Sequence, residues 1–260
     1  MLDMIFDSHA HYDDTAFDED RDELLASLKE NGIGYAVDIG ADMESSYKAV
    51  ELAQKYPFIY AAVGLHPDAA EECTQENMLK LKEMALNDRV KAIGEIGLDY
   101  HYQPDKKVQQ KICFEAHIDL AKDLGLPIVV HSREAAKDTM DIIKSTDAAS
   151  VGGVIHCFSY SKEMAGEYAD MGFYIGIGGV LTFNNAKKLK EAAEYIPLDR
   201  ILLETDCPYL SPVPNRGKRN SSLNLPYVVK ALAEIKGISE SEVVSVTCGN
   251  ALKMYKITEG

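Results

Sequence analysis

Short apolar runs rich in β-branched residues recur along the chain and alternate with stretches that have the periodicity of amphipathic helices. These runs are apolar at consecutive positions rather than at every second one, which is typical of strands buried on both faces of a parallel sheet. Eight of them are predicted as strands, with ends near the following positions: His11, Gly40, His66, Glu95, His131, His156, Gly179 and Asp206.

The spacing of these strands predicts how they are connected. Successive ends lie between 23 residues (156 to 179) and 36 residues (95 to 131) apart, close to the length of one strand–helix unit. Eight such units in about 250 residues predict an α/β protein with a (β/α)8 TIM barrel. A doubly wound open sheet is the alternative, because the pattern of the sequence does not show closure. No linker-like or low-complexity segment interrupts the chain, so we expect one domain over residues 1–260.

Helix signals support this alternation. The stretches 18–32 and 105–125 are predicted as helices with acids in the first turn, and each ends at a glycine, Gly32 or Gly125, that suits a left-handed stop. Two further helical patterns, around 221–236 and 239–254, are predicted as the eighth helix and a C-terminal addition.

Composition narrows the classes of protein. Hydrophobic residues make up 46% of the 260 residues, which is enough for a sizeable core. We expect no membrane span and no signal peptide, and the five scattered cysteines indicate free thiols in a reducing cytoplasm. The net charge of −15 repels polyanions, which argues against a protein that coats nucleic acid. A nuclease that grips a short segment remains compatible with it.

Histidines and carboxylates, the residue types that bind metals, occur at the predicted carboxyl ends of the strands. In a barrel these ends meet at one mouth. These residues are His9, His11, His66, Glu95, His131, His156 and Asp206. His9 and His11 stand two apart and therefore face the same side, which Asp7 shares and from which it is expected to orient a histidine. Without His66, which is not counted as a ligand, the six histidines and carboxylates fit two metal ions better than one, because one carboxylate can bridge both.

Six segments in the order "DSHAH", "VGLHP", "GEIGLDYH", "LPIVVHSREA", "GVIHCFS" and "ETDCPYLSPVPNRGKRN" give the chain a close resemblance to a known family. It resembles the TatD family of metal-dependent deoxyribonucleases within the amidohydrolase superfamily, whose barrel is of the metallo-dependent hydrolase type. The resemblance implies that one ion is bound by His9, His11, Glu95 and Asp206. It implies that the other is bound by Glu95, His131 and His156, with Glu95 as the bridge.

The resemblance also implies a reaction. Two divalent cations per chain, which can be Mg, Mn, Zn or Ni, would activate a water that cleaves phosphodiester bonds of DNA, from the 3′ side of single-stranded ends. Asp206, with Glu95 the second catalytic residue, would accept the proton of that water. Four cations are predicted to bind substrate. Arg133 is placed to reach into the mouth, with a helix-capping salt bridge as the alternative. The basic cluster of Arg216, Lys218 and Arg219 is expected to contact phosphate, with a solvated loop as the alternative.

Two other functions remain as alternatives. The same site could hydrolyse an ester or amide, such as an aminoacyl ester on tRNA. A metal-binding protein without activity is the weaker alternative, because every ligand position is filled. The expected partner is therefore single-stranded DNA or a short nucleic-acid end, with no membrane and no obligate protein partner.

Overall fold

The computed structural model describes residues 4–258, and within them eight strands and nine α-helices. In the sheet the strands follow one another in chain order, and Ala10 at the end of the first strand pairs with Cys207 after the last. This is the strand order of the predicted (β/α)8 barrel. The strands are β1 Ile5–Ala10, β2 Ile33–Ile39, β3 Ile59–Val63, β4 Val90–Asp99, β5 Ile128–Arg133, β6 Gly153–Ile155, β7 Tyr174–Ile177 and β8 Ile201–Leu203.

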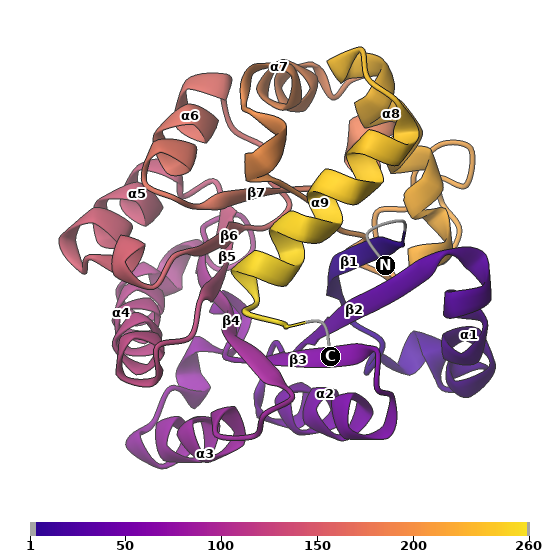
Figure 1. Cartoon of the computed structure of the whole chain (residues 1–260). Coiled ribbons are helices and arrows are strands. Elements are labelled where there is room, and N and C mark those ends of the chain that lie inside the picture. The colour runs from indigo at the N-terminus through magenta and orange to yellow at the C-terminus, as the bar shows by residue number, and fades with distance from the viewer. Residues whose placement is uncertain (1–3, 259–260) are drawn as a thin grey trace. The chain divides into compact units, whose positions relative to one another are not determined.

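Helices separate the strands, as the periodicity predicts (Figure 1). They are α1 Arg21–Leu28, α2 Met43–Lys55, α3 Gln75–Ala85, α4 Lys107–Leu124, α5 Ala136–Ser145, α6 Lys162–Asp170, α7 Lys187–Tyr195, α8 Leu225–Lys236 and α9 Glu240–Met254. The short 3-10 helices include η3 Pro67–Glu72, η4 Pro104–Lys106 and η6 Gly179–Thr182. None of the helices in residues 4–258 is long and apolar enough to cross a membrane.

The predicted end at Gly125 is confirmed for α4, whereas α1 ends at Leu28 and Gly32 caps the 3-10 turn Lys29–Asn31 that follows it. Gly32 and Gly125 both adopt left-handed backbone conformations, with φ of 83° and 64°. The predicted acid is missing from the first turn of α4, because the helix begins at Lys107 and Asp105 belongs to η4. An X-Pro pair favours the short η4 turn before the helix proper, since proline suits only the first turn of a helix.

The chain divides into two compact units, which are described separately. The first consists of residues 4–37, 157–170 and 174–258 and contains β1, β7 and β8. The second consists of residues 38–156 and 171–173 and contains β3 to β6. A single domain over the whole chain stays a prediction.

In the second unit, neighbouring helices in the chain cover the parallel strands. Helix α2 packs on β3, and α4 packs on β4 (Figure 1). β4 pairs in parallel with β3 and β5, and nearly all of its residues are buried. Its apolar sequence therefore reflects cover on both faces.

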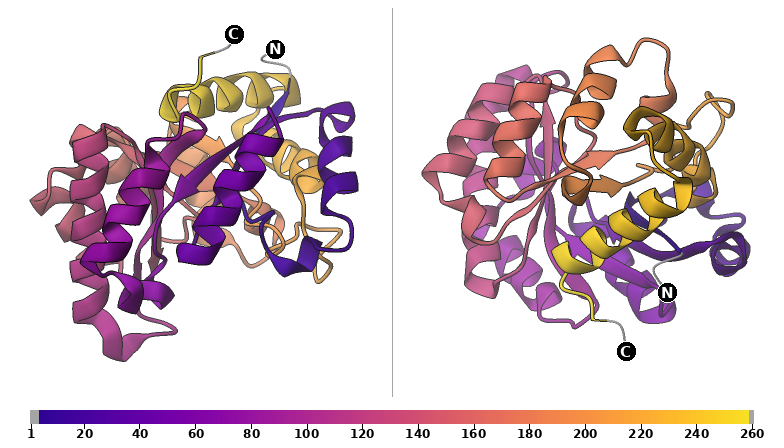
Figure 2. Two further views of the ribbon diagram at one scale, coloured as in Figure 1. Left: turned by 90° about the horizontal axis from the view of Figure 1, so that it is seen from below. Right: turned by 45° about the horizontal axis from the view of Figure 1, so that its top comes forward.

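In the first unit, β8 lies beside β1, and helix α9 packs against both (Figure 2). The Asn250 side chain donates to the carbonyl oxygens of Leu198 and Ile201, where β8 begins. The Tyr255 hydroxyl donates to the carbonyl of Ser8. Helix α9, the predicted C-terminal addition, thus contacts the beginning of β8. The polar side chains of the predicted site lie at the other, carboxyl end of this strand.

Candidate metal centre

Three predicted ligands of the first unit converge where β1 and β8 end, and are called the first donor set: His9, His11 and Asp206. The two Nε2 atoms of His9 and His11 lie 3.1 Å apart. An Asp206 carboxylate oxygen lies 3.7 Å from Nε2 of His9 and 3.4 Å from Nε2 of His11. The sequence prediction that the two histidines face the same side is therefore in agreement with the geometry.

These separations suit a bound cation. Nitrogen and oxygen ligands lie about 2.1 Å from a metal such as zinc, so neighbouring donors around one ion stand about 3.0–3.4 Å apart. The observed distances between the donors scatter about this range. Two imidazoles and one carboxylate also form a donor set that zinc, nickel and manganese accept. The first donor set fits a metal ion.

The backbone around the first donor set is held by Asp7. Its carboxylate accepts hydrogen bonds from the Thr205 hydroxyl at 2.7 Å and the Ser222 hydroxyl at 2.6 Å, and from the backbone N–H groups of Thr205 and His9. The contact of Asp7 with His9 is to the backbone N–H, and its expected role in orienting a histidine stays a prediction. Burial raises the pKa of Asp7 to about 7, although these hydrogen bonds lower it.

The remaining predicted ligands, called the second donor set, lie in the second unit: Glu95, His131 and His156. The Oε1 atom of Glu95 lies 2.8 Å from Nδ1 of His131 and 3.3 Å from Nε2 of His156. All three side chains are largely buried. One carboxylate oxygen between two imidazole nitrogens also fits a cation, because burial of these groups demands charge compensation.

A β-bulge accounts for the position of Glu95. Ile93 pairs with Ile128 and Ile96 with Val130, so three steps along β4 match two along β5. The extra residue bends the strand and redirects a side chain. Glu95 was predicted at the strand end, but β4 continues to Asp99. The prediction of the strand end was wrong, since the bulge leaves no clear mark in an apolar run.

The extended strand reveals a residue that the sequence analysis did not single out. Oδ2 of Asp99 accepts a hydrogen bond from Nε2 of His131 at 3.1 Å. Its other oxygen, Oδ1, accepts from the backbone N–H groups of His101 and Tyr102. Because Nδ1 of His131 also faces a carboxylate oxygen, Oε1 of Glu95 at 2.8 Å, the protonated ring donates to both carboxylates. With a metal at Nδ1, the remaining ring proton would lie on Nε2, where Asp99 would accept it. The position of Asp99 within "GEIGLDYH" was the available signal.

The electrostatic field at the second donor set favours positive charge. Burial lowers the pKa of His131, but the hydrogen bonds to Asp99 and Glu95 more than compensate, so that its pKa is raised. Burial works against ionisation of Asp99, yet the hydrogen bonds from His131 and Tyr102 bring its pKa down to about 2. A field that attracts a proton in this way also attracts a metal cation.

His66 stands next to this set without being a predicted ligand. Its ring packs edge-on against the ring of His131, with centroids 4.4 Å apart. Its Nδ1 accepts a hydrogen bond from the backbone N–H of Asp68 and so caps η3. Burial lowers the pKa of His66 to about 4, so the ring is neutral near pH 7. Its Nδ1 also lies 3.6 Å from a carboxylate oxygen of Asp68, and one of its ring nitrogens lies within 4.8 Å of donor atoms of Asp99 and His131.

The four predicted substrate cations differ in their surroundings. Arg133 is exposed at the end of β5, with its guanidinium 4.6 Å from the centroid of Tyr102. Arg216 lies 4.4 Å from the ring of Phe183, and Lys218 is exposed. Arg219 forms a two-point ion pair with Asp20 and donates to the carbonyl of Ala16. Arg219 therefore attaches the loop after β8 to the start of α1.

A small cavity lies beside Asp206 in the first unit. Glycines and apolar side chains dominate its wall, together with Glu204 and Thr205. Its apolar and glycine lining comprises Phe158, Gly176, Gly178, Gly179, Val180, Leu189 and Leu210. A Cβ atom at Gly179 would lie 2.1 Å from the carbonyl oxygen of Leu210, so only glycine allows this approach of η6. The cavity offers an apolar surface next to the first donor set.

Comparison with known proteins finds relatives that match nearly the whole chain. A family model described as "TatD related DNase" matches residues 6–256. A metal-dependent hydrolase of Bacillus subtilis (strain 168), YabD, is 43% identical over 254 residues, which cover 98% of this chain and all of YabD. The 3′-5′ ssDNA/RNA exonuclease TatD of Cronobacter sakazakii is 31% identical over 256 residues, covering 96% of this chain and 97% of that protein.

The same likeness holds in three dimensions. The crystal structure of YJJV, a TatD homologue from Escherichia coli K12, superposes with a TM-score of 0.92 at 28% identity. The match covers 99% of this chain and the whole of the other. The similarity therefore includes the fold of the whole chain and is not limited to the short motifs.

Proposed function

Because the chain belongs to the TatD-related DNase family of metal-dependent hydrolases, we propose that it cleaves phosphodiester bonds at single-stranded ends of DNA, from the 3′ side. The observation that carries the proposal is the first donor set, two imidazoles and a carboxylate at metal-binding separations beside an apolar cavity. The relative from Cronobacter, named as an exonuclease of single-stranded DNA and RNA, supports the class of substrate.

Each donor set has a proposed role in holding metal. His9, His11 and Asp206 would hold one divalent ion, and Glu95, His131 and His156 would hold a second; the family resemblance makes Glu95 the proposed bridge. Bound cations would lower the pKa of water to near neutrality and offset charge on the phosphoryl oxygens. With a metal bound at Nδ1 of His131, the ring proton would be on Nε2, where Asp99 would accept it and hold the ring in that tautomer.

The protein's own residues carry the remaining steps. Asp206 accepts the proton of the attacking water as general base, and Asp7 keeps its backbone in place through Thr205. Arg133, Arg216 and Lys218 bind phosphates that flank the scissile bond, and Arg219 positions the loop that carries two of them. The cavity beside Asp206 receives the apolar face of a terminal nucleoside.

The proposal is tested with the metal-stripped protein and single-stranded DNA labelled at its 5′ end. Addition of Mg²⁺, Mn²⁺, Zn²⁺ or Ni²⁺ in separate reactions should restore a ladder that shortens from the 3′ end. An Asp206→Asn sample prepared in parallel controls for contaminating nucleases. Release of internal fragments only, or activity on aminoacyl esters without any on DNA, would refute the proposed reaction.

A further inference from the structure

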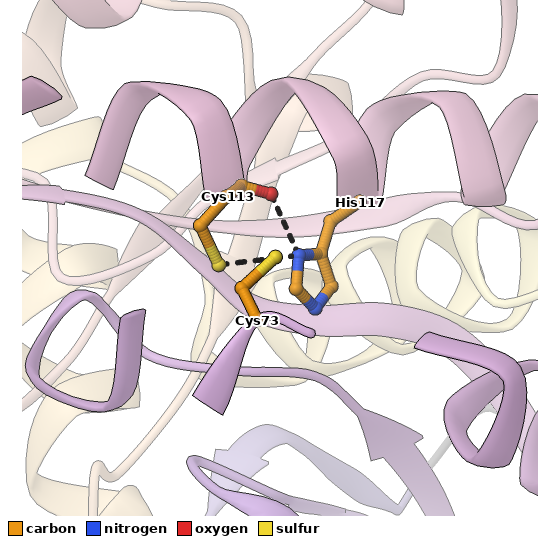
Figure 3. A group of neighbouring side chains, drawn as sticks. All are labelled: Cys73, Cys113 and His117. Carbon is orange, nitrogen blue, oxygen red and sulfur yellow. Dashed lines mark hydrogen bonds between the residues drawn. The ribbon is translucent and has the colours of Figure 1, made fainter. Parts of the chain in front are cut away.

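A second group of metal-ligating side chains lies in the second unit, outside the two donor sets: Cys73, Cys113 and His117 (Figure 3). Cys73 follows η3, and Cys113 and His117 lie one turn apart on α4. The donor atoms of all three lie within 4.8 Å of one another. Neither the proposed reaction nor the comparisons assign a role to them.

The hydrogen bonds of His117 argue against a metal here. Burial lowers the pKa of His117 to about 4, so the ring is neutral near pH 7 and carries one proton. Its Nδ1 lies 2.8 Å from the carbonyl oxygen of Cys113, an acceptor, so that nitrogen holds the proton. The lone pair is on Nε2, at the far edge of the ring from Cys113 (Figure 3). The nitrogen near the sulfur, 3.6 Å from Sγ of Cys113, therefore offers hydrogen rather than a lone pair.

The two thiols differ in a way that suits redox chemistry. Cys73 is half-buried and Cys113 is buried. A hydrogen bond from the Cys113 thiol lowers the pKa of Cys73, although burial opposes it. The same contact and burial raise the pKa of Cys113. Cys73, which solvent can reach, is thus the more readily ionised thiol, and the buried Cys113 beside it stays protonated.

We propose that Cys73 and Cys113 form an oxidisable dithiol that a peroxide converts into an intramolecular disulfide. The Cys73 thiolate attacks one oxygen of hydrogen peroxide, the O–O bond breaks, and with one proton water leaves and Cys73 becomes a sulfenic acid. The Cys113 sulfur then attacks the sulfur of Cys73, the S–O bond breaks, and the hydroxyl leaves with the thiol proton as water. Two thiols lose two electrons, and the peroxide gains them.

The segments that carry the two sulfurs are already in contact. The Gln109 side chain of α4 donates to the carbonyl of Ala70 in η3 at 3.2 Å, and Lys106 pairs with Glu71 at 2.9 Å. A disulfide would connect η3, capped by His66, to the helix whose Gln110 accepts from the backbone N–H of Asp99. The bond would thus join two segments that support the second donor set.

The test uses the reduced full-length protein and equimolar hydrogen peroxide, followed by alkylation and peptide mass mapping. Two of the five thiols should be lost, the mass should fall by about 2 Da, and Cys73 and Cys113 should appear in one cross-linked peptide that dithiothreitol releases. Cys113→Ser should stop at a sulfenic acid on Cys73, which dimedone traps. Cys248→Ser, the control from α9, should form the disulfide normally.

Two results would overturn the proposal. One is wild-type protein in which peroxide takes Cys73 to the sulfinic acid with no cross-link to Cys113. The other is a metal at this cluster, seen as a loss of one equivalent of zinc per chain in Cys73→Ser relative to wild type after both are loaded with zinc. Both measurements are independent of nuclease activity.

Discussion

The two ring nitrogens of His131 face different carboxylates, and this arrangement affects how strongly His131 can bind a metal. Nδ1 faces Glu95 at 2.8 Å, and Nε2 donates to Asp99 at 3.1 Å. A carboxylate behind a histidine fixes its tautomer and raises its basicity toward a cation. Asp99 is well suited to this because two backbone N–H groups hold its carboxylate in place. A single strand residue thereby prepares a ligand on the neighbouring strand.

Asp99→Asn should weaken metal binding about 10- to 100-fold, since the amide lacks the charge that makes His131 a strong ligand. Titration calorimetry of the stripped protein with Mn²⁺ or Zn²⁺ measures the affinity. Asp105→Asn, an exposed substitution in the nearby η4, is the matched control and should bind like wild type. Equal affinity in both variants would show that Asp99 has only a structural role.

Asp206→Asn should leave the fold intact and reduce turnover about 10²- to 10⁴-fold, because an amide cannot take up the proton of the attacking water. Some loss of metal affinity is expected too, as Asp206 belongs to the first donor set. Turnover is measured at saturating metal on a short oligonucleotide, with Asp199→Asn on the surface as the control. Near wild-type turnover at saturating metal would exclude Asp206 as the general base.

At the scale of elements, alternation of apolar strands and amphipathic helices carries nearly all the information that predicts the fold. The eight strands and the left-handed conformations of Gly32 and Gly125 follow from local periodicity and backbone preference. The bulge in β4 does not, because register depends on the neighbouring strand. The sequence therefore predicts Glu95 as a ligand, but not the register that brings Asp99 to His131. The ion pair of Arg219 with Asp20 could not be predicted either, because it joins residues nearly 200 positions apart that only the fold brings together.

Burial of His117 in α4 should make the stability of the protein sensitive to acid. An unfolded imidazole takes up its proton near pH 6.5, but the buried one near pH 4. Between these values the unfolded state binds more protons, so the free energy of unfolding falls as the pH decreases from 6.5 to 4. The full difference amounts to about 3 kcal/mol.

His117→Gln should therefore flatten the pH dependence of stability in this window. Urea unfolding in EDTA at several pH values from 7 to 4 measures it without a contribution from metal release. His101→Gln, which changes a more exposed imidazole, should retain the decline. A decline as steep in His117→Gln as in wild type would mean that other groups cause it.

At the scale of the whole molecule, one donor set lies in each of the two units. Metal content should therefore approach two ions per chain. Glu95→Gln should lower it more than His117→Ala does, because Glu95 faces two imidazoles and is the proposed bridge, whereas His117 lies in neither set. Elemental analysis of the purified variants decides this. Equal loss of metal in both would contradict the bridging role.

The net charge of −15 repels the proposed nucleic-acid substrate, so local cations such as those of the loop after β8 are needed to bind it. Arg216 and Lys218 are exposed in that loop, outside the first donor set, so they can meet flanking phosphates without contacting the scissile one. A contact made equally in the ground and transition states affects KM and leaves kcat unchanged. Each lost phosphate contact should flatten the log–log salt dependence of binding to single strands by roughly 0.7.

Replacing Arg216, Lys218 and Arg219 together with alanine should thus weaken binding of a short oligonucleotide and reduce its sensitivity to salt. Arg219→Ala alone should chiefly loosen the loop, since its guanidinium already pairs with Asp20. Hydrolysis of a small chromogenic phosphodiester, which has no flanking phosphates, should barely change in any of these variants. Titrations at several ionic strengths with both substrates measure the two effects separately. An unchanged salt slope in the triple variant would mean that the loop is only solvated, and that another surface must attract the substrate against the charge of the molecule.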